Sequence, residues 1–219
     1  MEIKPYNEIL KKSLIFHNMN DSEIENGIKF FSGRMAKYSK GEMLNTVSSP
    51  LHYFGIVLEG LVHVCMADFE GQKCIMATVS AGESFGESLS FLEIDTDVYI
   101  RAACESVVLW LCPKNVKGSC VFTDEERLYV NRFIEDLAIR GLNMNDRIQI
   151  MSKRTVREKI LTFLTLKSSQ CESDEFSVPF DRNAMAVYLG TDRSSLSREL
   201  SKMKAEGIID FKKNKFKIL

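Results

Sequence analysis

The clearest pattern of apolar and polar positions lies at the end of the chain, in residues 176–219, where two amphipathic helices and a strand pair are predicted. Asp181 and Asp192 stand where side-chain caps begin the helices, and Gly190 and Gly207 stand where the helices end. The inward-facing residues are Met185, Ala186 and Leu189 in the first helix and Leu196, Leu200 and Met203 in the second. The strands are predicted over residues 208–211 and 216–219, around Lys212, Lys213, Asn214 and Lys215. This order predicts a winged helix-turn-helix that binds DNA.

The outward face of the second helix carries polar side chains suited to DNA: Arg193, Ser194, Ser195, Ser197 and Arg198. Arginine offers two parallel donors that match the acceptor edge of guanine in the major groove, and a serine near a helix N-terminus suits a phosphate oxygen. Lys213, in the turn between the strands, is predicted to contact DNA as well. The alternative is an ordinary solvated face, but the order of capped helices, glycine stops and basic hairpin favours a DNA interface.

The first half of the chain changes from a helical to a strand pattern. Residues 1–31 indicate short helices, and residues 34–111 indicate short strands separated by glycines. The apolar runs of these strands lie at 54–58, 61–66 and 74–79, and residues 69–72 suit a hairpin turn between two of them. Regular short strands with glycine turns predict an antiparallel β sandwich or roll.

Residues 124–151 are predicted to form one long helix. Its apolar positions alternate in spacing between four and three: Val130, Ile134, Leu137, Gly141, Met144, Ile148 and Met151. This heptad pattern predicts a two-helix dimer interface, and the alternative is a helix that packs on its own domain. Ser152 marks a predicted hinge, after which residues 155–167 are predicted as a helix and residues 168–177 as a polar loop.

Charge is distributed unevenly over the 219 residues. Residues 153–219 carry 14 Lys and Arg against 9 Asp and Glu, whereas residues 1–152 carry 15 against 21. A basic C-terminal part on an acidic remainder fits a DNA-binding unit attached to a unit that does not bind DNA. No apolar run approaches the roughly 20 residues of a membrane span, and the N-terminus lacks the apolar core of a signal peptide. We therefore expect a cytoplasmic protein with no membrane partner.

The six cysteines are scattered, with no close pair of the C-x-x-C kind. This spacing argues against a zinc site or an iron–sulfur cluster and favours reduced thiols packed as small apolar side chains. The sequence contains no glycine-rich phosphate loop followed by lysine and no HExxH motif. We therefore expect no enzymatic activity and no metal site.

The order of these parts resembles the Crp/Fnr family of bacterial transcription regulators. The sensor half matches in YSKGEML at 38–44, GIVLEGLVHV at 55–64, AGESFGESL at 81–89 and RAACESVVLWL at 101–111. The DNA half matches in YLGTDRSSLSREL at 188–200 and AEGIID at 205–210. The resemblance implies an α+β chain with an antiparallel β-roll at 1–123, a dimerisation helix at 124–152 and a winged helix-turn-helix at 153–219. It also implies a homodimer on a near-palindromic operator in double-stranded DNA, with RNA polymerase as a further partner.

The effector pocket that the resemblance implies is only partly matched. Its candidate residues are Gly86, Glu87, Ser88, Thr96, Asp97, Met144 and Asn145. In the branch that binds cyclic AMP, a Glu after the glycine holds the ribose, and an Arg-Ser pair further on holds the phosphate. This chain reads Asp-Thr-Asp-Val at 95–98, where two carboxylates would repel a phosphate, and Arg101 matches a different arginine, which is usually structural. Cyclic AMP is therefore disfavoured, the effector is unknown, and no cofactor is predicted.

Other sensing mechanisms stay open. The family's oxygen-sensing branch uses an N-terminal cysteine cluster, which is missing because no cysteine precedes Cys65. Haem ligands would have to come from residues scattered through the sensor half: His52, His63 and Cys74. A thiol switch would use Cys104, Cys112 or Cys120. A regulator with a degenerate β-roll that senses nothing is a further alternative.

Overall fold

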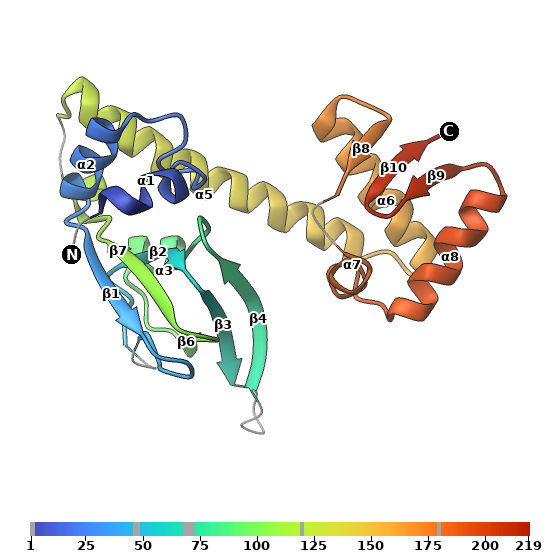
Figure 1. Cartoon of the computed structure of the whole chain (residues 1–219), viewed down its shortest axis with the longest axis horizontal. Coiled ribbons are helices and arrows are strands. Elements are labelled where there is room, and N and C mark those ends of the chain that lie inside the picture. The colour runs from blue at the N-terminus through green and yellow to red at the C-terminus, as the bar shows by residue number, and fades with distance from the viewer. Residues whose placement is uncertain (1–2, 46–48, 68–72, 119–120, 179–180) are drawn as a thin grey trace. The chain divides into compact units, whose positions relative to one another are not determined.

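The computed structural model describes residues 3–45, 49–67, 73–118, 121–178 and 181–219. The chain forms two compact units, Met1–Ala138 and Ile139–Leu219, and the division falls inside one long helix. Figure 1 labels the elements of each unit. The hairpin turn predicted over 69–72 lies outside the described residues. No helix in the described part of the chain is both long and apolar enough to cross a membrane.

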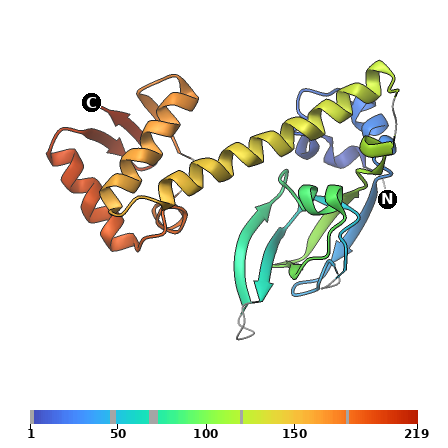
Figure 2. The same cartoon turned by 180° about the vertical axis from the view of Figure 1, so that it is seen from behind.

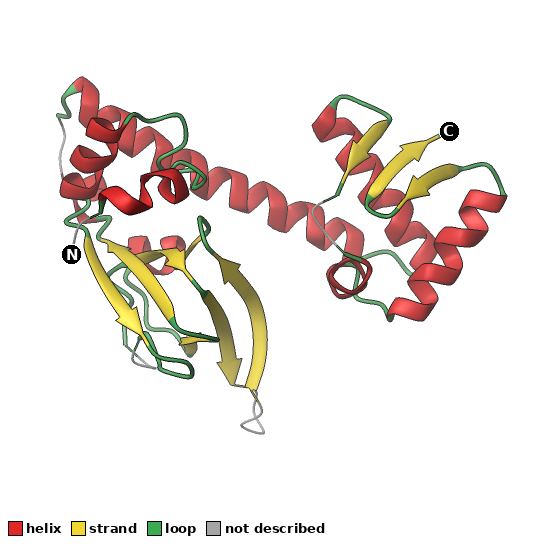
Figure 3. Cartoon of the chain, viewed as in Figure 1, coloured by secondary structure: helices red, strands yellow, loops and turns green. Residues whose placement is uncertain are grey.

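The strands of the first unit form two antiparallel sheets, as Figure 3 shows. One sheet has the order β1-β7-β2-β5, with bounds Arg34–Tyr38, Ser106–Leu111, Phe54–Glu59 and Ser84–Phe85. The other has the order β4-β3-β6, with bounds Lys73–Ser80, Leu61–Ala67 and Val98–Ala102. The predicted antiparallel β-roll is confirmed, and the three predicted apolar runs each fall within one of these strands.

Strands β2 and β7 are apolar along their length because both of their faces are buried. Side chains alternate between the two faces of a strand, so each strand contributes to two cores. The residues of β2 and β7 that face the helices are Phe54, Ile56, Leu58, Val107, Leu109 and Leu111. The residues that face the interior of the roll are Val57, Val108 and Trp110. These strands therefore separate a helix-lined core from a core inside the roll.

Helices cover the outer face of the β1-β7-β2-β5 sheet. Their bounds are η1 Lys4–Tyr6, α1 Asn7–Leu10, α2 Asp21–Phe30 and the long α5 Asp124–Met151; α3 Glu87–Leu92 and α4 Lys114–Gly118 follow strands β5 and β7. Asn20 and Glu23 form a capping box that begins α2. Tyr129 and Phe133, near the start of α5, are buried in the helix-lined core. The predicted long helix is therefore confirmed with the predicted bounds.

The heptad positions of α5 include large apolar side chains that solvent reaches. Ile134 is 53% exposed, Met144 67% and Ile148 59%. In the second unit, the end of α5 packs on the helices that follow it, because Ile150 is buried in their common core. The division between the two units lies within α5, between Ala138 and Ile139. The hinge that the sequence predicts at Ser152 stays a prediction.

The second unit has three helices and a small sheet. The bounds are α6 Val156–Cys171, α7 Arg182–Tyr188, α8 Arg193–Ala205, β8 Glu175–Ser177, β9 Ile209–Lys212 and β10 Lys215–Ile218, with sheet order β8-β10-β9. Strand β9 contacts α8, as Figures 1 and 2 both show. The predicted winged helix-turn-helix is confirmed, with its two hairpin strands shifted by one residue.

The loop predicted over residues 168–177 is wrong. Helix α6 continues to Cys171, where Glu172 ends it in the left-handed conformation. Strand β8 then pairs with β10, and Phe176 lies opposite Phe216. Phe176 is buried among the apolar residues of this unit, so a single aromatic side chain anchors a strand in an otherwise polar segment.

Candidate functional site

Helix α8 begins at a side-chain cap that also engages the first polar side chains of the helix. The Asp192 carboxylate accepts hydrogen bonds from the Ser195 amide at 2.8 Å and from the Ser194 hydroxyl at 2.5 Å. The hydrogen bond from Ser194, and then the bonds from Ser195, lower the pKa of the Asp192 carboxyl from its usual value. The cap therefore stays ionised at neutral pH, where its charge also favours the positive N-terminus of the helix.

The two faces of α8 differ in the way the sequence predicts. Leu196, Leu200 and Met203 are fully buried. The predicted DNA-contacting residues on the helix lie away from this core: Arg193, Ser194 and Arg198 are exposed, and Ser195 and Ser197 are half-buried. The structure therefore gathers on one accessible face the donors and acceptors expected of a recognition helix.

The acidic residues at the other side of α8 are paired. The Arg157 guanidinium on α6 binds the Glu199 carboxylate at 3.3 Å and also binds Glu206. Lys204 pairs in the same way with Asp210. These ion pairs hold carboxylates against neighbouring cations, so Arg193 and Arg198 face solvent with less opposing charge.

The hairpin of β9 and β10, which forms the wing, is fixed to helix α7 by Arg182, a residue that the sequence analysis did not single out. Arg182 donates from Nη2 to the Lys213 carbonyl oxygen at 2.8 Å. Its guanidinium also lies 5.1 Å from the ring centre of Phe211 and 5.3 Å from that of Phe216. Lys213 itself has a φ of 55° at the tip of the hairpin. This contact holds the backbone of the wing tip, and the exposed Lys213 side chain projects from it.

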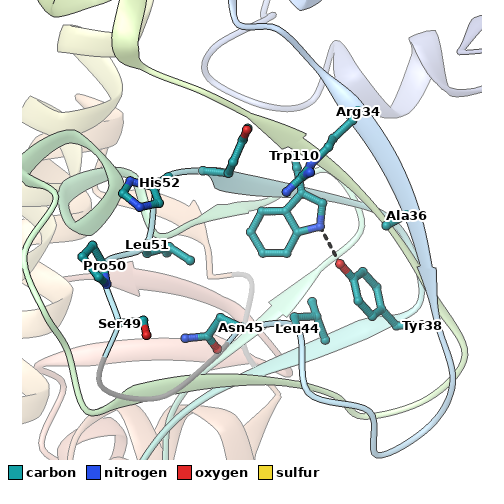
Figure 4. A pocket seen from close by; sticks show the side chains of 11 residues that line it. Arg34, Ala36, Tyr38, Leu44, Asn45, Ser49, Pro50, Leu51, His52 and Trp110 are labelled. Atoms are coloured by element: carbon teal, nitrogen blue, oxygen red, sulfur yellow. Dashed lines mark hydrogen bonds between the residues drawn. The ribbon is translucent and has the colours of Figure 1, made fainter.

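A pocket of about 510 Å³ opens at the inner side of the β-roll, within the usual size range for a small ligand. Its walls come from β1, the segments on either side of residues 46–48, and β7: Arg34, Ala36, Tyr38, Leu44, Asn45, Ser49, Pro50, Leu51, His52, Tyr53 and Trp110. Figure 4 shows the Trp110 ring among these side chains, with the Tyr38 hydroxyl directed at the indole nitrogen. The pocket therefore combines aromatic walls with several polar atoms.

Two contacts fix the polar side chains of this pocket. The Trp110 indole nitrogen donates to the Tyr38 oxygen at 2.8 Å, and the Arg34 guanidinium lies 4.2 Å from the ring centre of Tyr53. Burial raises the pKa of the Tyr38 hydroxyl, and the hydrogen bond from Trp110 opposes this shift. The neutral Tyr38 hydroxyl thus keeps its own proton, which it can donate to a ligand.

The effector residues predicted from the sequence lie outside this lining. Gly86 begins α3 with a φ of 84°, and an added Cβ would lie 2.7 Å from Cδ2 of Leu51, which lines the pocket. Glu87 is buried, and Ser88 is exposed. Gly86 therefore lets Leu51, a residue of the pocket wall, pack closely against the backbone at the start of α3. The predicted contact of Gly86 with an effector stays a prediction.

The remaining candidates are distributed over both units. The Thr96 hydroxyl accepts a hydrogen bond from the Val98 amide at 3.0 Å, and Asp97 is exposed. Met144 and Asn145 are exposed on the part of α5 that belongs to the second unit. No single unit therefore contains the whole predicted set.

The alternative sensor residues are also separated. His52 lines the pocket, whereas His63 lies on the outer face of β3, because its neighbours Val62 and Val64 face the core of the roll. Cys104 is exposed and Cys112 half-buried; Cys120 lies outside the described residues, as does the side chain of Cys74. Arg101 points away from the roll, toward Gly41. Among the described side chains, no group of three or more His, Cys, Asp and Glu could hold a metal ion.

Two family models match the chain in the order of its two units. Residues 35–118 match the cyclic nucleotide-binding domain, and residues 158–219 match the Crp-like helix-turn-helix domain. A roll of the cyclic nucleotide-binding kind followed by a helix-turn-helix domain defines a transcription regulator that binds DNA. The chain belongs to the Crp/Fnr family of transcription regulators.

Individual relatives agree with this assignment. The nitrogen fixation regulation protein FixK of Bradyrhizobium diazoefficiens is 27% identical over 183 residues, which are 81% of this chain and 74% of FixK. The catabolite activator protein of Thermus thermophilus has a TM-score of 0.53 at 19% identity, covering 94% of each chain. DNR from Pseudomonas aeruginosa has a TM-score of 0.53 at 18% identity, covering 100% of this chain and 96% of DNR. The two solved structures support the fold alone.

Proposed function

We propose that this protein is a homodimeric regulator that binds a near-palindromic operator and responds to a small effector other than cyclic AMP. The observation that carries the proposal is the accessible face of α8, where Arg193, Ser194 and Arg198 are exposed opposite a fully buried apolar face. Arg193 and Arg198 each offer a bidentate donor pair for guanine. Ser195, Ser197 and Lys213 supply further contacts, which suit backbone phosphates.

The homodimer would form through the heptad face of α5. This face carries exposed apolar side chains at a spacing that suits a second identical helix, and Ile148 and Met144 are its most exposed large members. A two-fold pair of recognition helices would enter major grooves about 34 Å apart, which requires an inverted repeat. Contact with RNA polymerase follows from the family and belongs to the same proposal.

The dimer interface can be tested with a matched pair of substitutions. Ile148→Asp places a charge on the heptad face, whereas Leu142→Asp places the same charge beside it, on a residue that is 64% exposed. We expect Ile148→Asp to give monomers in analytical ultracentrifugation and Leu142→Asp to leave the dimer intact. Dimers in both variants, or monomers in both, would contradict the assignment of this face.

The effector would be a small organic anion bound inside the β-roll. The pocket supplies the Arg34 guanidinium and the Trp110 and Tyr53 rings, which suit a carboxylate on a flat apolar body. Cyclic AMP is not favoured, because residues 95–98 supply two carboxylates and no arginine for its phosphate. A thermal-shift screen of small carboxylates should find stabilising compounds in the wild type but not in Arg34→Leu.

The proposed function is tested by a binding selection of full-length protein on random double-stranded DNA, with and without reductant. We expect an inverted repeat with half-sites one helical turn apart, and we expect Arg193→Ala to relax the preference at the base pair that Arg193 faces. A visible spectrum recorded on the same sample tests for haem or an iron–sulfur centre, both of which absorb visible light. Recovery of a single unpaired half-site would contradict the homodimer, and random sequences under every condition, including with the screened carboxylates, would contradict the regulator.

A further inference from the structure

The hydroxyl of Ser194 is already engaged within its own helix. It lies 2.5 Å from an oxygen of the Asp192 carboxylate, which also accepts from the Ser195 amide. An ionised carboxylate has lone pairs and no proton, so it can only accept. The proton in the contact between Ser194 and Asp192 is therefore the serine proton, and the serine is the donor.

The hydrogen bond from Ser194 to Asp192 determines whether the Ser194 hydroxyl can act as a donor or only as an acceptor toward DNA. A serine hydroxyl carries one proton and two lone pairs. With its proton directed at Asp192, Ser194 presents only lone pairs, and therefore only acceptor capacity, to a partner in the groove. Turning the proton toward a base would break a bond to a charged group, which is stronger than a bond to a neutral one.

The surroundings maintain this arrangement. The carboxylate is held at the N-terminus of α8, where the helix dipole favours negative charge, and the Ser195 amide fixes its position. Ser194 follows at the second position of the helix and is exposed. When DNA excludes water from this surface, the contact between serine and carboxylate loses its competitors and becomes stronger.

We propose that Ser194 reads the operator as a hydrogen-bond acceptor only, and so selects adenine or cytosine on the strand that it faces. In the major groove adenine offers its N6 amino group and cytosine its N4 amino group, whereas guanine and thymine offer acceptors at the matching positions. If the Ser194 oxygen faced guanine O6 or thymine O4, two acceptors would meet and no hydrogen bond could form between them. The inference rests on the proposed DNA-reading role of α8, and it adds the class of base that this position selects.

The test is a binding selection with the full-length protein and three variants. Ser194→Ala identifies the base pair that Ser194 faces, because only that column of the motif should lose its preference. In the wild type we expect adenine or cytosine in that column, at about three- to tenfold over guanine or thymine, the range for one hydrogen bond of about 0.7–1.4 kcal/mol. Asp192→Asn keeps a good helix cap but replaces the carboxylate with a neutral amide, whose oxygen holds the serine proton less strongly. This variant should admit guanine and thymine in the same column.

Ser201→Ala is the matched control, because the Ser201 hydroxyl donates to the Ser197 carbonyl oxygen at 3.0 Å on the same helix. Its motif should equal that of the wild type. Thermal unfolding should show that Ser194→Ala folds as the wild type does, since the Ser195 amide still caps the helix.

The outcomes distinguish this inference from the proposed function. A wild-type inverted repeat with guanine or thymine in the Ser194 column would overturn the acceptor role and leave the regulator intact. An unchanged motif in Ser194→Ala, or loss of the whole motif from a folded Ser194→Ala protein, would also overturn it. A wild type that selects no inverted repeat would overturn the proposed function and this inference together.

Discussion

Replacing Gly190 by alanine tests how the turn between α7 and α8 is built. Gly190 has a φ of 58°, and the left-handed conformation costs a residue with a Cβ about 1–2 kcal/mol. The new Cβ would lie 2.6 Å from Cε of Met151, so the end of this side chain must shift, and a torsion held about 30° off its rotamer costs about 0.5–1.5 kcal/mol. We therefore expect Gly190→Ala to destabilise the second unit by about 1.5–3.5 kcal/mol.

Gly207 offers a matched control within the same unit. Its φ is 73°, and a Cβ there would meet nothing within 4 Å, so Gly207→Ala should show only the backbone cost. Amide hydrogen exchange of peptides from α7 and α8 measures both variants locally. Because 1.4 kcal/mol is a tenfold change in an equilibrium, exchange through unfolding of this unit should rise about 10- to 300-fold in Gly190→Ala. Fluorescence of Trp110, the single tryptophan, reports the first unit and should not change.

The contact with Met151 is then isolated by a double variant. Gly190→Ala with Met151→Ala should regain the part of the loss that comes from the displaced methionine and keep the backbone part. Equal exchange rates in Gly190→Ala and Gly207→Ala would refute the reasoning, because the close approach of Met151 would then contribute nothing.

Three further predictions address the DNA interface and the first unit. Arg193→Ala should weaken operator binding by about 1–3 kcal/mol in a fluorescence anisotropy titration, and equal affinity would remove this residue from the interface. Arg182→Met keeps apolar contact with the wing but loses the bond to the Lys213 carbonyl; the double variant with Lys213→Ala should bind DNA as weakly as the weaker single variant, whereas additive losses would separate the two residues. Burial, and then the hydrogen bond with Glu125, raise the pKa of Tyr129, so the neutral phenol stabilises the fold below about pH 10 and this contribution is lost as the pH rises further. Tyr129→Phe should therefore reduce the loss of stability between about pH 10 and 12 in urea titrations followed by tryptophan fluorescence, and an identical pH profile would exclude that role.

The parts of the fold that could be predicted are those with local chemical signals. Asp181 and Asp192 accept the capping hydrogen bonds that their positions predict, from Ala184 and Ser195. A cap needs only residues three positions apart, so the sequence contains the whole motif. The period of the apolar positions likewise predicted the long helix α5.

Features that depend on distant partners could not be predicted in the same way. Strand β8 contains one apolar residue, Phe176, and exists because β10 pairs with it. The pocket needs Arg34 of β1 to lie beside Trp110 of β7, a register that no local pattern specifies. The anchoring of the wing by Arg182 has the same origin, because the sequence shows an arginine at a helix start and nothing of the carbonyl it binds.

Strand β7 connects the pocket to the helix-lined core of the first unit, so a bound molecule could change the packing of that core. Trp110 lines the pocket, while its chain neighbours Leu109 and Leu111 point to the opposite side, into the core that holds the start of α5. A ligand that displaces Trp110 must therefore shift the peptide groups that also carry these leucines. Effector binding at Trp110 and the packing change at Leu109 would thus be linked through the backbone of β7. Substitutions at Leu109 should therefore alter how much an effector changes DNA binding, while the affinity for that effector stays nearly the same.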